Sequence, residues 1–183
     1  MKILRVFFSI ALLCLASMAE AQGNPFKPVP QTMLAGERLQ PPGLGLSIQR
    51  PGPGWTWTYM GDLEEHNFQA VNPETNQVFM VIVIPNPEPL SKQRAEEYIQ
   101  GVRKAAEGDG GKLMDVSLQP SQIPSPGSFR YTHGLQTEDG TGYWTGYLVA
   151  AGPHQFCVIQ EIRRSPGESA ELTKFVRSFQ IVK

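Results

Sequence analysis

The sequence predicts an α+β fold in which an antiparallel β-sheet is flanked by two main helices. The strongest signal is residues 78–84, seven apolar residues in a row that end in a proline-rich segment. Successive side chains of a strand point to opposite faces, so an unbroken apolar run indicates a central strand covered on both sides. Apolar residues then recur at three- and four-residue steps in residues 91–107 and 166–179. This spacing predicts two amphipathic helices that pack on the sheet.

The first residues have the three parts of a secretory leader. A basic start, a short apolar core and a small-x-small motif ending at Ala21 predict a signal peptide over residues 1–21. Cleavage after Ala21 would make Gln22 the first residue of the mature protein. Such a leader directs export, so the periplasm is the expected compartment, and secretion is the alternative. The apolar core is too short for a stable membrane span. A lipid anchor on Cys14 is not expected, because Leu13 stands where lipoprotein leaders have a small residue.

One domain is predicted after the leader. Residues 22–43 contain five prolines and few large apolar residues, which is typical of a flexible lead-in that carries little fold. Leu46 and Ile48 then alternate with polar residues, so the single folded domain is predicted to span residues 44–183. A domain of this length can bury a substantial hydrophobic core.

Turns and caps divide this domain into elements. Asn72-Pro73 and Asp139-Gly140 suit the turns of two hairpins. The predicted strands are residues 68–71 with 77–84, residues 129–135 with 143–151, and an interior strand within residues 155–162. Ser91 can cap the first helix. Ser165, with Pro166 and Glu168 after it, predicts the start of the second helix.

The order of these elements resembles the PsbP-like α/β/α sandwich, a family that includes extrinsic photosystem subunits and bacterial envelope proteins similar to DcrB. The resemblance rests on an opening strand that ends in Pro53-Gly54-Trp55, a hairpin, an amphipathic helix, a three-strand meander and a closing helix that ends in Ser178-Phe179. It implies a non-enzymatic module that acts by contacting other proteins. No binding residue follows from it, because no binding motif of the family matches this chain.

Charge and motifs narrow the function classes. The formal net charge of −1 and the lack of a basic cluster argue against nucleic acid and against an anionic membrane surface. The glycine pairs lack the spacing of phosphate-binding loops, so no cofactor is expected. Cleavage would leave Cys157 as the last cysteine, so no intrachain disulfide is expected.

A few residue types could carry chemistry. Cys157 and His154 suggest a nucleophile and its base, but residues three apart on a strand normally point to opposite faces. A buried structural thiol is the simpler interpretation. His66 and His133 have no metal-site spacing with each other or with His154, so no metal is expected.

The acidic doublets Glu64-Glu65 and Glu138-Asp139 lie in predicted loops, where solvated side chains are the default. Carboxylates of this kind are nevertheless the residues that a glycosidase-like hydrolase would use. A small exported hydrolase that uses Cys157 or loop carboxylates is therefore the alternative function.

The aromatic side chains of Trp55, Trp57 and Tyr59 alternate with threonines and share one side of a strand. They either cover the sheet or, where exposed, anchor a partner. Tyr143, Thr145 and Tyr147 form a similar stripe. The predicted function is an exported, non-catalytic binding or assembly module of the cell envelope. Its expected partner is an envelope protein, and the candidate surface is the stripe at positions 55, 57 and 59.

Overall fold

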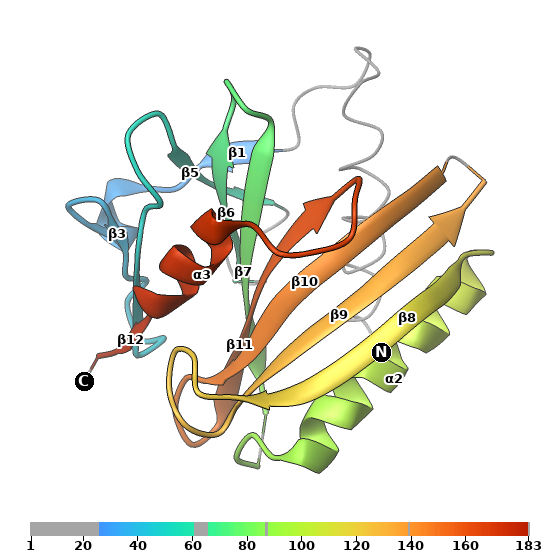
Figure 1. The fold of residues 1–183 in the computed structure, drawn as a ribbon. Coiled ribbons are helices and arrows are strands. Elements are labelled where there is room, and N and C mark those ends of the chain that lie inside the picture. Colours follow the sequence, from blue (N-terminus) through green and yellow to red (C-terminus); the bar gives the residue numbers. More distant parts are fainter. Residues whose placement is uncertain (1–25, 61–65, 87, 139, 183) are drawn as a thin grey trace.

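The computed structural model describes residues 26–60, 66–86, 88–138 and 140–182 (Figure 1). The predicted signal peptide, its cleavage site between Ala21 and Gln22, and Cys14 lie outside the described residues. The same holds for Glu64-Glu65 and for Asp139.

About half of the described chain belongs to two antiparallel sheets. The large sheet has eight strands, in the order β1 (Phe26–Pro28), β5 (Thr56–Met60), β6 (Asn67–Asn72), β7 (Gln77–Pro85), β11 (Gln155–Arg163), β10 (Gly140–Ala150), β9 (Ser128–Thr137) and β8 (Lys112–Ser121). The small sheet has four, in the order β12 (Gln180–Ile181), β4 (Leu46–Gln49), β3 (Arg38–Leu39) and β2 (Leu34–Ala35). The helices are η1 (Gln31–Met33), α2 (Lys92–Gly108) and α3 (Ala170–Arg177). Among the described residues, no helix is long and apolar enough to cross a membrane.

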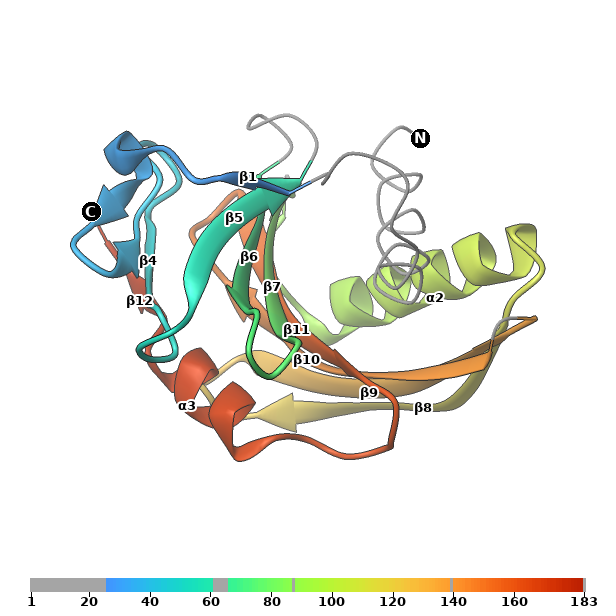
Figure 2. The ribbon, with the colours of Figure 1, turned by 90° about the horizontal axis from the view of Figure 1, so that it is seen from above.

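The predicted α/β/α sandwich, one sheet flanked by two main helices, is wrong. The described chain is mainly antiparallel strand, divided between an eight-stranded and a four-stranded sheet. The large sheet curves around the side on which α2 lies, and the eight-residue α3 lies against its other face (Figure 2). The small sheet packs on that same face, because its Leu39, Leu46 and Ile48 belong to the same buried cluster as α3. A second sheet therefore contributes much of the cover that the sequence assigned to a longer helix.

The interior strands were predicted correctly. Strand β7 contains residues 78–84 and lies between β6 and β11, and β11 lies between β7 and β10. The turn of the first hairpin is held by Asn72, whose Oδ1 accepts hydrogen bonds from the backbone nitrogens of Glu74 and Thr75 at 3.0 and 3.3 Å. Ser91 is the N-cap of α2, and its Oγ accepts from the backbone nitrogen of Arg94 at 3.3 Å.

The start of the second helix was placed four residues too early. Ser169, rather than Ser165, is the N-cap of α3, and its Oγ accepts from the backbone nitrogen of Leu172 at 3.0 Å. The carboxylate of Glu161 fixes this cap, because it accepts from the backbone nitrogen of Ser169 at 2.6 Å and from its Oγ at 2.7 Å. The buried glutamate on β11 thus decides which serine begins the helix.

The predicted lead-in carries more structure than its composition indicates. Its described part forms β1, η1, β2 and β3, and Leu39 is fully buried. The guanidinium of Arg38 donates to Ser47 Oγ at 2.7 Å and to the carbonyl of Ser178 at 2.8 Å. These contacts tie the segment to β4 and to the end of the chain, so at least this part belongs to the folded domain.

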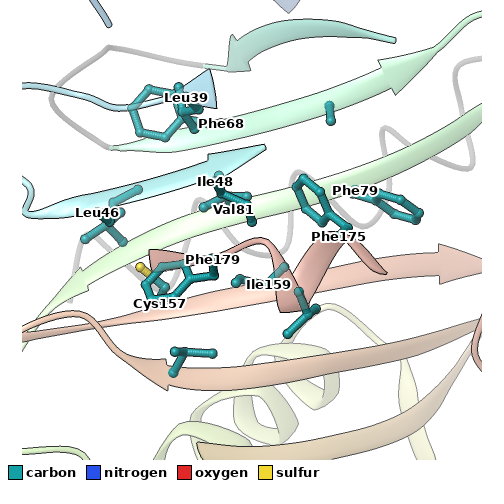
Figure 3. Packing of buried hydrophobic residues seen from close by; sticks show 14 of the residues in the cluster. Leu39, Leu46, Ile48, Phe68, Phe79, Val81, Cys157, Ile159, Phe175 and Phe179 are labelled. Atoms are coloured by element: carbon teal, nitrogen blue, oxygen red, sulfur yellow. The ribbon is translucent and has the colours of Figure 1, made fainter. Parts of the chain in front are cut away.

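The large sheet separates two apolar layers. On the α3 side, Val81, Cys157 and Ile159 pack with Phe79 and Phe175 (Figure 3). On the α2 side, the buried cluster includes Met80, Ile82, Tyr131 and Leu148 together with Ala95 and Ile99 of α2. Because both faces of β7 are buried, this strand is the centre of the fold, as its apolar run predicts.

Candidate binding site

One row of residues crosses the large sheet on its α2 side. Residues directly opposite each other in antiparallel strands share a face, so the strand register defines this row. It runs through Thr58, Gln69, Met80, Gln160, Gly146, Tyr131 and Leu118. A buried row of this kind is normally apolar, and this one contains two glutamines.

In the middle of the row, the side chains of Tyr131 and Gln160 meet above Gly146 and form a hydrogen bond. A Cβ on Gly146 would lie 2.7 Å from Gln160 Cβ and 2.7 Å from the ring and hydroxyl of Tyr131. The missing side chain lets the Tyr131 hydroxyl donate to Gln160 Oε1. Gln160 Nε2 in turn lies 3.5 Å from the Met80 sulfur. Gln160 is therefore a buried amide with partners at both ends.

The β5 end of the row is different. Gln69 is fully buried and Asn67, two residues before it on the same face of β6, is 2% exposed. Neither end of either carboxamide has a hydrogen-bond partner, nor does the Oγ1 of Thr58 opposite Gln69. Each buried polar group left in this state costs about 1 to 3 kcal/mol, and native proteins contain few. We call Thr58, Asn67 and Gln69 the polar cluster.

The surroundings of the polar cluster are aliphatic. Met60, Met80 and Ile82 are buried on the same side of the sheet. Next to Gln69 the face becomes partly open, because Thr58, Val71 and Val78 are half-buried. Helix α2 makes its extensive sheet contacts with β8 and β9, at the opposite end of the row. The site therefore combines uncharged donors and acceptors with flexible apolar side chains, and half-buried residues border it at the β5 end of the row.

A surface hollow lies along α2. It is lined by Gln93, Glu96, Glu97, Gln100, Gly101 and Lys104. These side chains are mostly exposed and of mixed charge, so they do not form a site that is shielded from solvent.

The three histidines do not meet. His133 is 5% exposed and lies in a stack of rings, with centroids 5.8 Å from Tyr131 and 5.3 Å from Trp144. His66 directly precedes β6 and has a φ of 50°, and His154 is exposed in the turn before β11. In the part of the chain that the structure describes, no group of three potential metal ligands gathers.

The buried imidazole should make stability depend on pH. Burial lowers the pKa of His133 from 6.5 to about 4. Between pH 4 and pH 6.5, His133 is therefore protonated in the unfolded chain but neutral in the folded protein. The contribution of this group to the free energy of unfolding is full above pH 6.5 and decreases as the pH falls towards 4. Each pKa unit corresponds to about 1.4 kcal/mol, so the full loss of stability from this group is on the order of 3 kcal/mol.

Denaturant unfolding at pH 7.5 and 5.0 should show part of this loss of stability in the parent and in His154→Gln. In His133→Phe it should be smaller. An equal loss in all three proteins would remove His133 as its source.

Cys157 and His154 do not form a catalytic pair. The Cys157 side chain is fully buried on the α3 side of β11, and burial raises the pKa of its thiol. His154 is exposed in the preceding turn. A nucleophilic cysteine needs a lowered pKa and access to substrate, and Cys157 has neither.

A thiol probe should confirm this placement. On a Cys14→Ser background, a maleimide at neutral pH is expected to label Cys157 only after denaturation, because reaction needs an exposed thiolate. Labelling is followed by mass spectrometry, with Cys157→Ser as the blank. Rapid reaction of the folded protein would contradict the buried position and return Cys157 to the hydrolase hypothesis.

Two carboxylates outside the loop doublets, the half-buried Glu168 and the buried Glu161, are engaged near the start of α3. Glu168 accepts hydrogen bonds from Arg130 Nε at 2.8 Å, from the Tyr147 hydroxyl at 2.9 Å and from Thr173 Oγ1. Burial acts to raise the pKa of Glu168, but these hydrogen bonds outweigh it and lower the pKa. Glu161 is 3% exposed and is engaged by Ser169. Both carboxylates hold the segment that leads into α3. Glu138, the described member of the loop doublets, is exposed.

The aromatic stripe is mostly core. Trp55 and Trp57 are 5% and 7% exposed. The Trp55 ring stacks on Phe79 at 4.8 Å between centroids, and the Trp57 ring lies 5.9 Å from Phe175. This burial removes both tryptophans from the candidate partner surface. Tyr59 is half-buried, with Lys27 Nζ 5.7 Å from its ring centroid.

Comparisons with known proteins identify no family. No family model matches the chain, and no curated protein matches it. A crystal structure of a protein from Bacteroides thetaiotaomicron VPI-5482, determined at 1.50 Å resolution, is similar with a TM-score of 0.51 and 14% sequence identity. The match covers 82% of this chain and 50% of the Bacteroides protein, so this chain spans about half the length of that protein. At such low identity the likeness concerns the fold alone. The resemblance to PsbP-like proteins gains no support from these comparisons.

Proposed function

We propose that the protein is an exported, non-catalytic binding or assembly module of the cell envelope that acts through protein contacts. The observation that carries this proposal is the polar cluster on the α2 side of β5 and β6, where both carboxamides and the threonine hydroxyl lack partners. Buried polar groups without partners are destabilising, so each one needs an explanation, and a ligand or partner that hydrogen-bonds to them would supply it.

The reactive groups favour binding over catalysis. The one described cysteine is buried, and the described histidines are dispersed. Glu161 and Glu168 are engaged in hydrogen bonds that hold α3. The leader predicted from the sequence supports export. The net charge of −1 gives no electrostatic attraction for nucleic acid. The aliphatic side chains around the polar cluster are best suited to contact with another protein.

A pull-down from envelope extract tests this function. Protein expressed from its full coding sequence carries either Val71→Lys, next to the polar cluster, or Gln119→Lys, an exposed position on β8. We expect the parent and Gln119→Lys to retain the same envelope protein at similar yield, and Val71→Lys to lose it while remaining folded by circular dichroism. Equal capture by both variants, or no reproducible partner for the parent, would refute the proposal.

A further inference from the structure

The structure assigns a ligand class to the polar cluster: we infer that Thr58, Asn67 and Gln69 bind the main-chain amides of an uncharged, aliphatic polypeptide segment. This inference rests on the proposed function and deepens it, because it states which chemical groups of the partner are recognised.

The donor and acceptor inventory is the first argument. Each carboxamide offers an N–H₂ donor and a carbonyl acceptor, and a threonine hydroxyl can do both. All five of these sites are buried and unpaired. None carries charge, so an ionic ligand would be buried without a counter-charge, which is strongly unfavourable. A peptide group, with one N–H and one C=O, matches this set.

The flanking side chains are the second argument. Met60 and Met80 are unbranched and polarisable, and methionine adapts to varied apolar partners. Ile82 and the half-buried Val71 and Val78 continue an aliphatic surface. The described rings on this side of the sheet, including Tyr131, His133 and Trp144, belong to the half covered by α2. A sugar would find no ring to stack on beside the cluster, whereas aliphatic side chains of a peptide would find contact.

The comparison of two glutamines is the third argument. Gln69 and Gln160 face the same side of the sheet, and each lies directly opposite Met80. Gln160 accepts from the Tyr131 hydroxyl, whereas Gln69 has no partner. If the fold alone required an amide here, Gln69 would be expected to have a partner as Gln160 does. An unpaired amide costs stability, and a bound peptide group would offset that cost.

The experiment uses N-acetyl-leucine N-methylamide as the probe, an uncharged aliphatic molecule with two amide groups. Protein expressed from its full coding sequence is labelled with ¹⁵N, and the side-chain N–H₂ signals of Asn67 and Gln69 are followed during titration. We expect a saturable shift of these signals, and none with methyl glucoside. Gln69→Met keeps the volume and removes the hydrogen-bonding groups, so it should weaken binding at least tenfold while Tm stays equal or rises.

Gln160→Met is the matched control. It leaves the Tyr131 hydroxyl without its acceptor, so Tm should fall, while probe binding by the folded variant changes less than twofold. The inference is overturned if the parent does not bind the probe, if methyl glucoside binds in its place, or if Gln69→Met binds as well as the parent. It is also overturned if Gln69→Met lowers Tm as much as Gln160→Met, because an ordered water would then satisfy the amide. Partner capture that succeeds in the pull-down while the probe fails would leave the proposed function standing without this ligand class.

Discussion

Val81→Asp is expected to prevent the protein from folding. Val81 is fully buried at the middle of β7, between β6 and β11, and faces the α3 side with Phe79 and Ile159. A carboxylate there would have no counter-charge, and its burial should cost more than about 5 kcal/mol, comparable to the whole stability of a typical domain. Circular dichroism and a thermal melt would show no cooperative transition.

The control for this change is Gln136→Asp, at an exposed position of β9. A surface substitution away from special features should alter the free energy of unfolding by less than about 0.5 kcal/mol. A Val81→Asp protein that melted like the Gln136→Asp protein would show that β7 is not the central strand.

Gly146→Ala is expected to lower the free energy of unfolding by about 3 kcal/mol or more. The new methyl group would lie 2.7 Å from Tyr131 and from Gln160, closer than Cβ atoms are found in proteins. Overpacking alone costs about 1 to 3 kcal/mol, and separating the Tyr131 hydroxyl from Gln160 adds the cost of unpaired buried groups. Denaturant titration measures the change.

Gly52→Ala provides the comparison, because a Cβ at Gly52 would meet no atom within 4 Å. Its φ lies outside the left-handed region, so the substitution should be neutral or stabilising by less than about 1 kcal/mol. Equal effects of the two substitutions would mean that Tyr131 and Gln160 do not meet over Gly146.

The parts of the fold that could be predicted are those with local causes. The run at residues 78–84, the Asn72 turn and the Ser91 cap each depend on neighbouring residues, and all three are present. By sequence Ser165 is the better cap, because Pro166 and Glu168 follow it, but in the structure Glu161 of β11 engages Ser169 instead. The proline-rich composition of residues 22–43 does not indicate the strands of two or three residues found there. Of these strands, β1 pairs with β5 and β3 pairs with β4, so their partners are distant in sequence.

The candidate site could not be predicted for a related reason. Polar residues that alternate in a strand normally indicate a solvated face, and Asn67 and Gln69 fit that pattern. Only the register, which sets Thr58 opposite Gln69 and Gln69 opposite Met80, shows that they share the side on which α2 lies. Whether a buried amide has a partner depends on side chains from other strands. Gln160 is paired because Tyr131 reaches it across Gly146.

The small sheet has a consequence for the order of assembly. Strand β12, next to the end of the chain, pairs with β4, and Arg38 reaches the carbonyl of Ser178 across 140 residues of sequence. Contacts between such distant residues form slowly, because the intervening chain must be ordered first. The edge of β4 therefore stays unpaired until residues 180–181 have been made and have folded back onto it. A product that stops before residue 180 would expose this edge to proteases, so the small sheet makes degradation sensitive to whether β12 is present.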